Sequence, residues 1–532
     1  MKINIMKLLF TFLLATTSVI MMAQHDPSKT EEKFRRALQY MRLSYVDSVD
    51  ENKMTEIAIR SMLEELDPHS VYMSAEEIKQ ANEPLEGNFD GVGIQFQIIR
   101  DTINVVDVIA GGPSETVGIQ AGDKIVSIDQ ENATGKEVNN TYVVKHLRGP
   151  KGTKVIVGIV RKGEKDPIEF TVTRDKIPIY SIDAAYMVAP EIGYIKLNKF
   201  AATTMDEFSD AIKELKKENF KSLILDLRDN GGGYLQTAID LADQFLPKDQ
   251  LVLFTQGRSD PRKDYIATSK GAFEKGKLVI LIDEGSASAS EIVSGAMQDC
   301  DRALIIGRRS FGKGLVQRPF SFPDGSVMRM TVARYYTPSG RCIQKPYNDG
   351  HEKYYEDLSD RMEHGEFVHP DSIKFPDSLR YKTNAGRVVY GGGGIMPDVF
   401  IPLDTTKYSD YYVKLIRKNL FSTFTLDYLS QNREKLLSDY QTVELFKKNH
   451  KIDEAYMKSF LDAAEKAGVE FEQEGYDQSK VIIETLLNAY LARSLYGPEA
   501  YYIIISDIDT ELMKAIECIQ QPGTFEKYSV HY

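Results

Sequence analysis

Two kinds of hydrophobic pattern alternate along the chain and predict where its helices and strands lie. In residues 29–80 apolar positions recur at helical spacing, as in EEKFRRALQYMRLSYV and KMTEIAIRSMLEELDPHS, and Asp67-Pro68 ends the second stretch. From Gly87 the pattern changes to alternating β-branched runs separated by turn residues, with one short helix predicted in NTYVVKHLRG. We therefore expect a helical segment at residues 27–85 and a strand-rich domain at residues 86–176.

The pattern of residues 177–403 is typical of an α/β core. Continuous apolar runs of the buried-strand type, SLILDL, KLVILID and ALIIG, alternate with helical stretches such as TTMDEFSDAIKELKKENF. This alternation predicts mostly parallel strands covered by helices. Residues 348–390 are polar and tyrosine-rich and are interpreted as an excursion from the core, and residues 404–532 are again mostly helical. The predicted fold class is therefore multidomain, combining α/β and α+β parts.

The N-terminus, MKINIMKLLFTFLLATTSVIMMAQHDP, predicts a secretory signal peptide at residues 1–23. Lys2 and Lys7 give a positive start, an apolar run follows, and Ala23 is a small residue suited to cleavage. The run is short for a spanning helix, which needs about 20 apolar residues, so cleavage is favoured over an uncleaved membrane anchor. No cysteine follows the run, which argues against a lipoprotein. We expect an exported protein, periplasmic or otherwise outside the cytoplasm.

Composition narrows the classes of function. A chain of 532 residues with 42% hydrophobic and 27% charged residues is an ordinary soluble protein of roughly three domains. The net charge of −12 argues against a nucleic-acid partner. The cysteines, Cys300, Cys342 and Cys518, are too few and too widely spaced for a disulfide framework. Without C-x-x-C or H-E-x-x-H, neither a metal site nor a cofactor is predicted.

The stretch LIDEGSASASE, residues 281–291, places three serines at the start of a predicted helix. Ser288 and Glu291 fit the S-x-x-E capping box, so a purely structural role is one interpretation. The other is that Ser288, following a buried strand and a tight turn, exposes its hydroxyl at the carboxyl edge of the sheet, where open α/β sheets bind ligands. A serine is a weak nucleophile, so the second interpretation requires a neighbouring base.

Lys313 is the candidate base. None of the eight histidines lies between residues 177 and 345, which weakens a Ser-His-Asp interpretation. A lysine can serve instead if burial lowers its pKa toward neutrality. Gly312 and Gly314 leave room around Lys313, and the strand period of two predicts Lys313, Leu315 and Gln317 on one face. Gln317 is then placed to hydrogen-bond the lysine amine.

Two glycine-containing loops complete the candidate chemistry. LILDLRDNGGGYL carries Gly231, Gly232 and Gly233 from a buried strand into a helix, which suits an anion or a transient oxyanion, although a tight turn without a ligand is equally consistent. GRRSFGKG, residues 307–314, matches the phosphate loop G-x-x-x-x-G-K-[ST] of nucleotide hydrolases at every position except the last. The hydroxyl that would hold Mg²⁺ is replaced by Gly314, and apolar LVQ follows, so a nucleotide hydrolase is the less favoured alternative.

An ordered set of motifs resembles the carboxy-terminal processing proteases, also called tail-specific proteases. The motifs, which lie between Thr30 and Leu403 in the family's order, are LDPHS, GVGI, AGDKIVSID, LRGPKGT, LDLRDNGGG, GSASASE, FGKGLVQ, YYTPSGRCIQ and GIMPD. The interval of 25 residues from Ser288 to Lys313 also resembles the family. The resemblance implies a serine protease core at residues 177–403 and a PDZ domain at residues 86–176.

The same resemblance implies roles for individual residues. It implies Ser288 as nucleophile, Lys313 as general base, Gln317 as the residue that orients the lysine, and Glu291 as a carboxylate near the dyad. Gly232 and Ala289 fall at the oxyanion donors, and Gly91, Val92, Gly93 and Ile94 at the loop that binds a substrate's terminal carboxylate. The chain departs from the family in one place, because N-G-G-G stands where N-P-G-G is usual, and Gly231 makes this loop more flexible.

The predicted function is an exported serine endopeptidase that recognises protein C-terminal tails through its PDZ domain and cleaves near them. Its expected partners are proteins or peptides with free C-termini, and no nucleic acid; a homo-oligomer and an activating adaptor stay open, as does the role of residues 404–532. The alternatives are a catalytically inactive PDZ-containing adaptor and a P-loop-like nucleotide hydrolase. The filled dyad positions argue against the adaptor, and export to a compartment that normally lacks ATP argues against the hydrolase.

Overall fold

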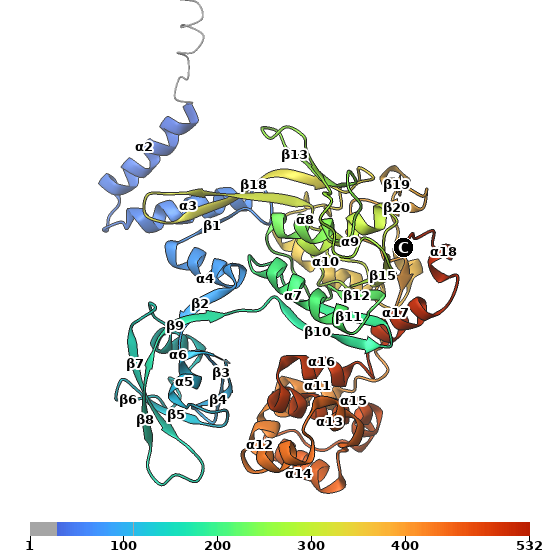
Figure 1. Ribbon diagram of the computed structural model, residues 1–532. Helices are drawn as coiled ribbons and strands as arrows, with labels where there is room; N and C mark the ends of the chain where they lie inside the picture. The colour runs from blue at the N-terminus through green and yellow to red at the C-terminus, as the bar shows by residue number, and fades with distance from the viewer. Residues whose placement is uncertain (1–28, 110) are drawn as a thin grey trace, which may run out of the picture. The chain divides into compact units, whose positions relative to one another are not determined.

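The computed structural model describes residues 29–109 and 111–532 (Figure 1). Two compact units are present, one up to Tyr72 and one from Met73 onward. The predicted signal peptide, residues 1–23, lies outside the described residues. None of the helices in the described part of the chain combines the length and apolar character that a membrane crossing requires.

The first unit contains the two helices that the apolar spacing predicts, α2 (Lys29–Ser44) and α3 (Glu51–Glu64). Asp50 caps α3 by accepting a hydrogen bond from the Lys53 N–H at 3.1 Å. The short strand β1 (Val71–Met73) lies at the boundary of the units. Helix α4 (Ala75–Glu86), which was expected in the same helical segment, belongs to the second unit, and a capping box between Ser74 and Glu77 starts it.

The strand-rich domain is antiparallel. Strand β2 pairs with β9, and a six-stranded sheet has the order β3-β4-β5-β7-β8, with β6 on β5. The strands are β2 (Asn88–Gly91), β3 (Ile94–Ile99), β4 (Thr102–Val108), β5 (Lys124–Ile128), β6 (Glu131–Asn132), β7 (Lys154–Val160), β8 (Ile168–Thr173) and β9 (Asp175–Pro178). The predicted helix is α6 (Asn140–Leu147); a second helix, α5 (Pro113–Val117), is too short to produce a periodic apolar pattern.

A six-stranded sheet with the order β10-β11-β12-β15-β16-β21 forms the α/β core. Its strands are parallel except for the antiparallel pair β10-β11, which agrees with the prediction of a mostly parallel sheet. The strands are β10 (Ile182–Ala189), β11 (Ile192–Leu197), β12 (Ser222–Asp226), β15 (Leu278–Ile282), β16 (Leu304–Gly307) and β21 (Val399–Phe400).

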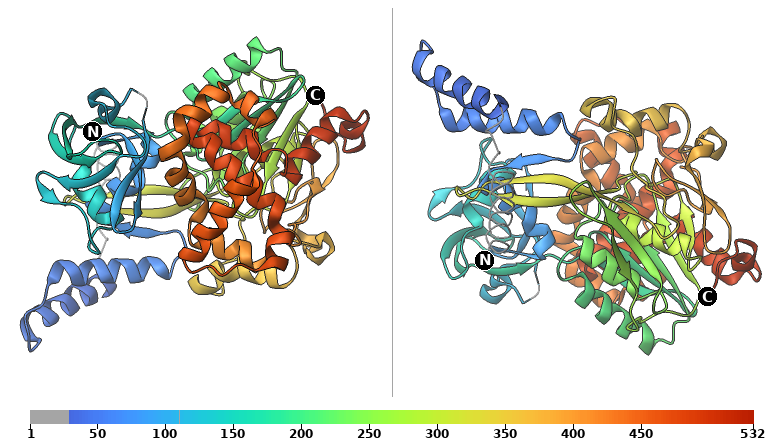
Figure 2. Two further views of the ribbon diagram at one scale, coloured as in Figure 1. Left: turned by 90° about the horizontal axis from the view of Figure 1, so that it is seen from below. Right: turned by 90° about the horizontal axis from the view of Figure 1, so that it is seen from above.

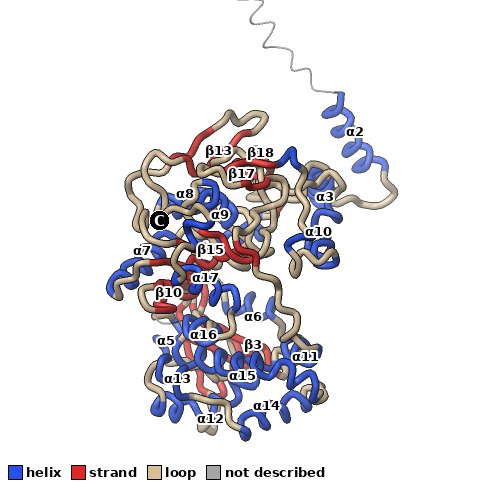
Figure 3. Tube along the Cα trace, turned by 90° about the vertical axis from the view of Figure 1, so that its right-hand side faces the viewer, coloured by secondary structure: helices blue, strands red, loops and turns tan. Residues whose placement is uncertain are grey.

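Both faces of this sheet are covered, which explains why its central strands are continuously apolar. Leu223 and Ile280 belong to the hydrophobic cluster shared with α7 (Thr204–Lys217), α8 (Leu235–Asp243) and α9 (Ala289–Asp299). Their neighbours Ile224 and Leu281 face the opposite cluster, which is shared with α17 (Thr510–Gln520) and α18 (Thr524–Lys527). Figure 3 shows α8 and α9 on one side of β15 and α17 on the other.

A second, antiparallel sheet and the predicted excursion complete the core. Strands β13 (Leu251–Gln256), β14 (Lys263–Ile266), β17 (Leu315–Ser321) and β18 (Val327–Tyr336) belong to this five-stranded sheet, and the β17–β18 hairpin extends from the core as a long arm (Figure 2). The excursion contains α10 (His351–Glu363), the 3₁₀ turns Pro370–Ser372 and Asp377–Leu379, and the hairpin β19 (Arg380–Lys382)–β20 (Val388–Tyr390).

The helical C-terminal region has two structural parts. One has its own hydrophobic core and consists of α11 (Asp410–Arg417), α12 (Leu420–Asp439), α13 (Val443–Asn449), α14 (Glu454–Lys466), α15 (Gln473–Tyr496) and α16 (Pro498–Ile505). The other, α17 and α18, covers the core sheet through Leu512, Ile519 and Phe525. Helices α17 and α18 therefore complete the α/β core, although the helical pattern alone did not separate them from residues 404–505.

Candidate active site

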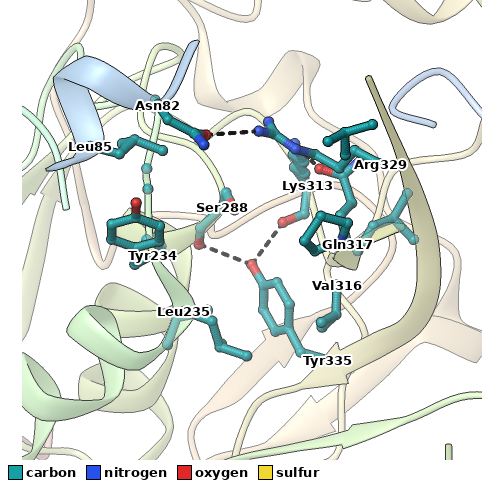
Figure 4. Close-up of a pocket in the computed structure, with 18 of the residues that line it drawn as sticks. Asn82, Leu85, Tyr234, Leu235, Ser288, Lys313, Val316, Gln317, Arg329 and Tyr335 are labelled. Atoms are coloured by element: carbon teal, nitrogen blue, oxygen red, sulfur yellow. Dashed lines mark hydrogen bonds between the residues drawn. The ribbon is translucent and has the colours of Figure 1, made fainter. Parts of the chain in front are cut away.

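The three serines before α9 have different environments. Ser286 and Ser290 are fully buried, and their hydroxyls donate to the carbonyls of Leu227 and Asn230, each at 2.8 Å. Ser288 instead lines a cavity of about 660 Å³ (Figure 4). Of the three, Ser288 is therefore the serine whose hydroxyl a substrate can reach.

The backbone of Ser288 is strained. Its φ of 54° and ψ of −108° lie in a region that a residue with a Cβ rarely adopts, at a typical cost of about 1–3 kcal/mol. The surroundings hold it there, because the Ser288 N–H donates to Glu291 Oε2 at 2.8 Å. In α/β hydrolases, a serine on a sharp strand-to-helix turn serves as the nucleophile. The same geometry fits that role here.

Lys313 and Gln317 line the same cavity as Ser288 (Figure 4). The Lys313 Nζ lies 3.5 Å from Gln317 Oε1, so the sequence correctly placed these two side chains together. A register shift between Val316 and Gln317 interrupts the strict alternation, and Val316 therefore also lines the cavity. Because Gly314 leads directly into β17 and not into a helix, the loop lacks the helix N-terminus that a phosphate loop requires.

Glu291 joins the serine and lysine loops. Its Oε1 accepts from the Ser310 hydroxyl at 2.5 Å and the Gly312 N–H at 2.7 Å. Its Oε2 accepts from the N–H groups of Ser288 and Lys313, both at 2.8 Å. Burial raises the pKa of Glu291 to about 7, and these four donors act in the opposite direction. Glu291 thus caps α9 and also holds the lysine loop through its hydrogen bonds.

We expect Glu291→Gln to lower kcat roughly 10- to 100-fold, since small displacements of catalytic groups have effects of this size. Glutamine has the same shape but only one acceptor oxygen. Its amide NH₂ group would therefore replace a carboxylate oxygen that accepts from two donors in the wild-type enzyme. Peptide cleavage assays at several pH values measure the effect. Protonation mimics the substitution, so wild-type kcat should fall as the pH drops through about 7, and the variant should lose this component.

Glu77→Gln is the matched control, because Glu77 is also the glutamate of a capping box, at the start of α4. It should change kcat little. Equal effects of the two substitutions on kcat would show that Glu291 acts only as a helix cap.

Tyr335 is a site residue that the sequence analysis missed, although it lies within the motif YYTPSGRCIQ. Its hydroxyl is 3.1 Å from the carbonyl oxygen of Ser288 and 2.8 Å from that of Lys313 (Figure 4). Burial raises its pKa well above the usual value, so the hydroxyl keeps its proton and can donate. Tyr335 therefore connects the backbones of the two predicted dyad residues.

The glycine loop lies against the start of α9. A Cβ on Gly232 would come within 2.9 Å of the Ala289 nitrogen and the Ala287 oxygen, so only glycine fits this approach. The Gly232 N–H donates to Asn230 Oδ1 at 2.9 Å and would have to leave this acceptor to bind an oxyanion. Among the described residues, the Ala289 N–H has no hydrogen-bond acceptor. The oxyanion roles of Gly232 and Ala289 stay predictions.

The predicted tail-binding residues Gly91, Val92, Gly93 and Ile94 connect β2 to β3. Gly93 has a φ of +77°, which a glycine adopts easily. Strand β3 stands at the end of its sheet, so among the described residues only one of its edges is paired with another strand. Binding of a tail by these residues stays a prediction.

The predicted excursion supports the lysine loop. The buried guanidinium of Arg361 in α10 donates to the carbonyl oxygens of Arg309 at 2.7 Å and Ser310 at 3.1 Å. Arg309 in turn contacts Glu366 at 2.6 Å. The polar composition of residues 348–390 indicated a departure from the core but not this contact with the residues before Lys313.

Four family models match the chain. They are the peptidase family S41 over residues 191–351, the PDZ domain over residues 91–176, the activating protease CtpB N-terminal domain over residues 15–77, and a family of unknown function over residues 411–497. Ser288 and Lys313 both lie within the S41 match.

Curated relatives agree with these matches. A carboxy-terminal-processing protease of Bartonella bacilliformis is 37% identical over 340 residues, covering 62% of this chain and 77% of the relative. The carboxy-terminal processing protease CtpB of Bacillus subtilis is 34% identical, covering 61% and 67%. The solved photosystem II D1 C-terminal processing protease is 26% identical, with a TM-score of 0.37, covering 70% and 87%. The chain belongs to the carboxy-terminal processing proteases of peptidase family S41, which are serine-type peptidases, and it contains a PDZ domain.

Proposed function

We propose that this protease is exported and cleaves proteins near their C-termini with a Ser288–Lys313 dyad, after the PDZ domain has bound the substrate's tail. The observation that carries the dyad is the shared cavity, in which Ser288 has a strained backbone and Lys313 lies beside Gln317. The pattern of residues 1–23 supports export.

The chemistry follows from the roles of these groups. Neutral Lys313 accepts the proton of the Ser288 hydroxyl as Oγ attacks the scissile carbonyl carbon. The oxyanion of the tetrahedral intermediate is stabilised by backbone N–H groups, with Ala289 and the glycine loop as the donors offered by the cavity wall. The C–N bond then breaks, and the departing amine takes the proton from Lys313. Water activated by the same lysine hydrolyses the acyl-enzyme and restores Ser288.

Tail recognition is proposed on the geometry of the PDZ domain. The N–H groups of residues 91–94 provide donors for a terminal carboxylate, and the open edge of β3 can pair with an extended tail. Helix α6 contributes Val144, whose side chain is exposed. Apolar tail residues would then lie between β3 and α6.

Amidating the C-terminus of a good substrate should lower kcat/KM roughly ten-fold or more, because a hydrogen bond to a charged group contributes about 1.5–3 kcal/mol. The assay compares one protein with the same apolar tail, carrying either a free or an amidated C-terminus, well below saturation. The control is a short peptide without the tail, which should be cleaved at a low rate that amidation does not change. Equal kcat/KM for the two proteins would refute carboxylate recognition.

A further inference from the structure

Three loops that leave neighbouring parallel strands carry the proposed chemistry. The loop after β12 contains the three glycines, the loop after β15 contains Ser288, and the loop after β16 contains Lys313. Each loop also has a charged residue close to the end of its strand, namely Arg228, Glu284 and Arg308. Their relative positions determine whether nucleophile, base and oxyanion donors meet.

Acidic residues at the start of α17 connect two of these loops. Arg228 forms a two-pronged contact with Asp509, at 2.9 and 2.6 Å. Arg308 Nη1 lies 2.6 Å from Glu511 Oε1, and Arg228 Nη1 lies 3.5 Å from Glu511 Oε2. Glu511 therefore lies between the arginine of the glycine loop and the arginine of the lysine loop.

The serine loop joins the same network. Arg308 Nε donates to Glu284 Oε2 at 2.8 Å, and Arg228 also pairs with the buried Asp226 at 2.6 Å. The network thus includes one residue of each loop, Asp226 at the end of β12, the α17 N-cap Asp509 and Glu511 in the first turn of α17. Because paired Arg and carboxylate groups have fixed, planar geometry, the contacts constrain distance and orientation together.

The network is largely shielded from water. The side chains of Arg308 and Glu511 are 7% and 14% exposed, and those of Arg228 and Asp509 are 15% and 12% exposed. Burial acts to raise the pKa of Glu511, but the charges of Arg228 and Arg308 outweigh it and leave the pKa below its usual value. Removing one member would leave a shielded charge without its partner, which the neighbouring loops would accommodate by moving.

Helix α17 is itself firmly placed. Leu512, Ala515 and Ile519 are buried against the core sheet, and the Asp509 side chain caps the helix by accepting the Leu512 N–H at 2.9 Å. The matching family models end at or before residue 497, so none of them assigns a role to α17. Packing against the sheet accounts for the apolar face of α17 but not for the acidic residues at its start.

We propose that Asp509 and Glu511 are positioning residues for catalysis, which hold Arg228 and Arg308 and thereby set the relative positions of the glycine, serine and lysine loops. This inference rests on the proposed Ser288–Lys313 chemistry. It gives the C-terminal end of the chain a part in the active site without contact with the substrate.

The test uses Asp509→Asn, Glu511→Gln and the double variant, each in the full-length enzyme. Both substitutions preserve shape and remove one charge. We expect the double variant to lower kcat about 10- to 100-fold while KM changes less than about two-fold, because loop displacement affects the chemical step more than tail binding. Glu511→Asp, which keeps the charge, should recover part of the kcat lost in Glu511→Gln.

Glu517→Gln is the matched control on the same helix, because Glu517 is 56% exposed and pairs with Lys514 away from the network. It should have wild-type kcat. Thermal unfolding is measured for every variant, and kcat is determined well below each Tm. Wild-type kcat in the double variant, or a loss fully accounted for by unfolded enzyme, would overturn the proposal.

The rate of Ser288 labelling by a fluorophosphonate separates this inference from the proposed function. If the dyad is correct, the wild-type enzyme is labelled at Ser288 and the double variant is labelled more slowly. Absence of labelling together with absence of peptide cleavage in the wild-type enzyme would overturn the dyad, and the positioning role with it. Normal labelling in both enzymes would overturn the positioning role alone.

Discussion

Ser288→Ala is expected to lower kcat roughly 10⁴-fold or more, the effect typical of removing the nucleophile from a serine peptidase. The reason is that the substitution deletes the only hydroxyl of the serine triplet that lines the cavity, and neighbouring side chains cannot replace it. Cleavage of a protein with a free apolar tail, followed over hours, measures the residual rate. Tail binding should persist, so the variant should still capture substrates.

Ser286→Ala and Ser290→Ala are the matched controls for this result. Both should keep measurable cleavage, because their hydroxyls point away from the cavity into hydrogen bonds with the carbonyls of Leu227 and Asn230. Each should instead lower the free energy of unfolding by about 1–3 kcal/mol, since a buried acceptor loses its partner. Full activity in Ser288→Ala would rule out the dyad.

Lys313→Arg is expected to inactivate the enzyme as completely as Lys313→Ala. In both variants kcat should fall roughly 10³-fold or more, because the general base is lost while the nucleophile stays in place. Arginine keeps the positive charge but cannot release its proton in a protein, so it cannot accept the proton of Ser288. The measurement is kcat for both variants between pH 6 and pH 10 in steps of about one unit. Substantial activity in Lys313→Arg would show that charge, and not proton transfer, is the contribution of this residue.

The pH profile of the wild-type enzyme should have an acid limb with two origins. In the proposed dyad, protonation of Lys313 removes the base. Protonation of Glu291, whose pKa is raised to about 7 by burial, removes an acceptor from the N–H groups of Ser288 and Lys313. The ionised form of Glu291 predominates above this pH and is lost below it, so both effects reduce kcat in the same direction. The apparent pKa of the limb then belongs to the pair of groups.

The sequence predicted those parts of the molecule that depend on local pattern. The strands around SLILDL, KLVILID and ALIIG, the helix after Ser288 and the proximity of Lys313 to Gln317 follow from apolar periodicity, turn residues and strand alternation. The motifs that resemble the family identified the protease and its PDZ domain, and the family matches confirm both.

What the sequence could not predict depends on contacts between distant segments. An amphipathic pattern in residues 510–520 indicates a helix but not that its apolar face covers β15 and β16. The contact of Tyr335 with two backbone carbonyls requires the course of β18 to be known. The Asn230 side chain accepts a hydrogen bond from the Gly232 N–H within the loop, and the run of three glycines does not indicate this bond.

The position of α17 in the chain has a consequence for the timing of enzyme assembly. Its partners in the core sheet, such as Tyr194 and Leu281, are synthesised hundreds of residues before Leu512 and Ile519. One face of the sheet therefore stays uncovered in a nascent chain, and a core with so many long-range contacts closes late. If α17 also sets the catalytic loops, the nascent protease is inactive until α17 has been synthesised and has packed against the core sheet.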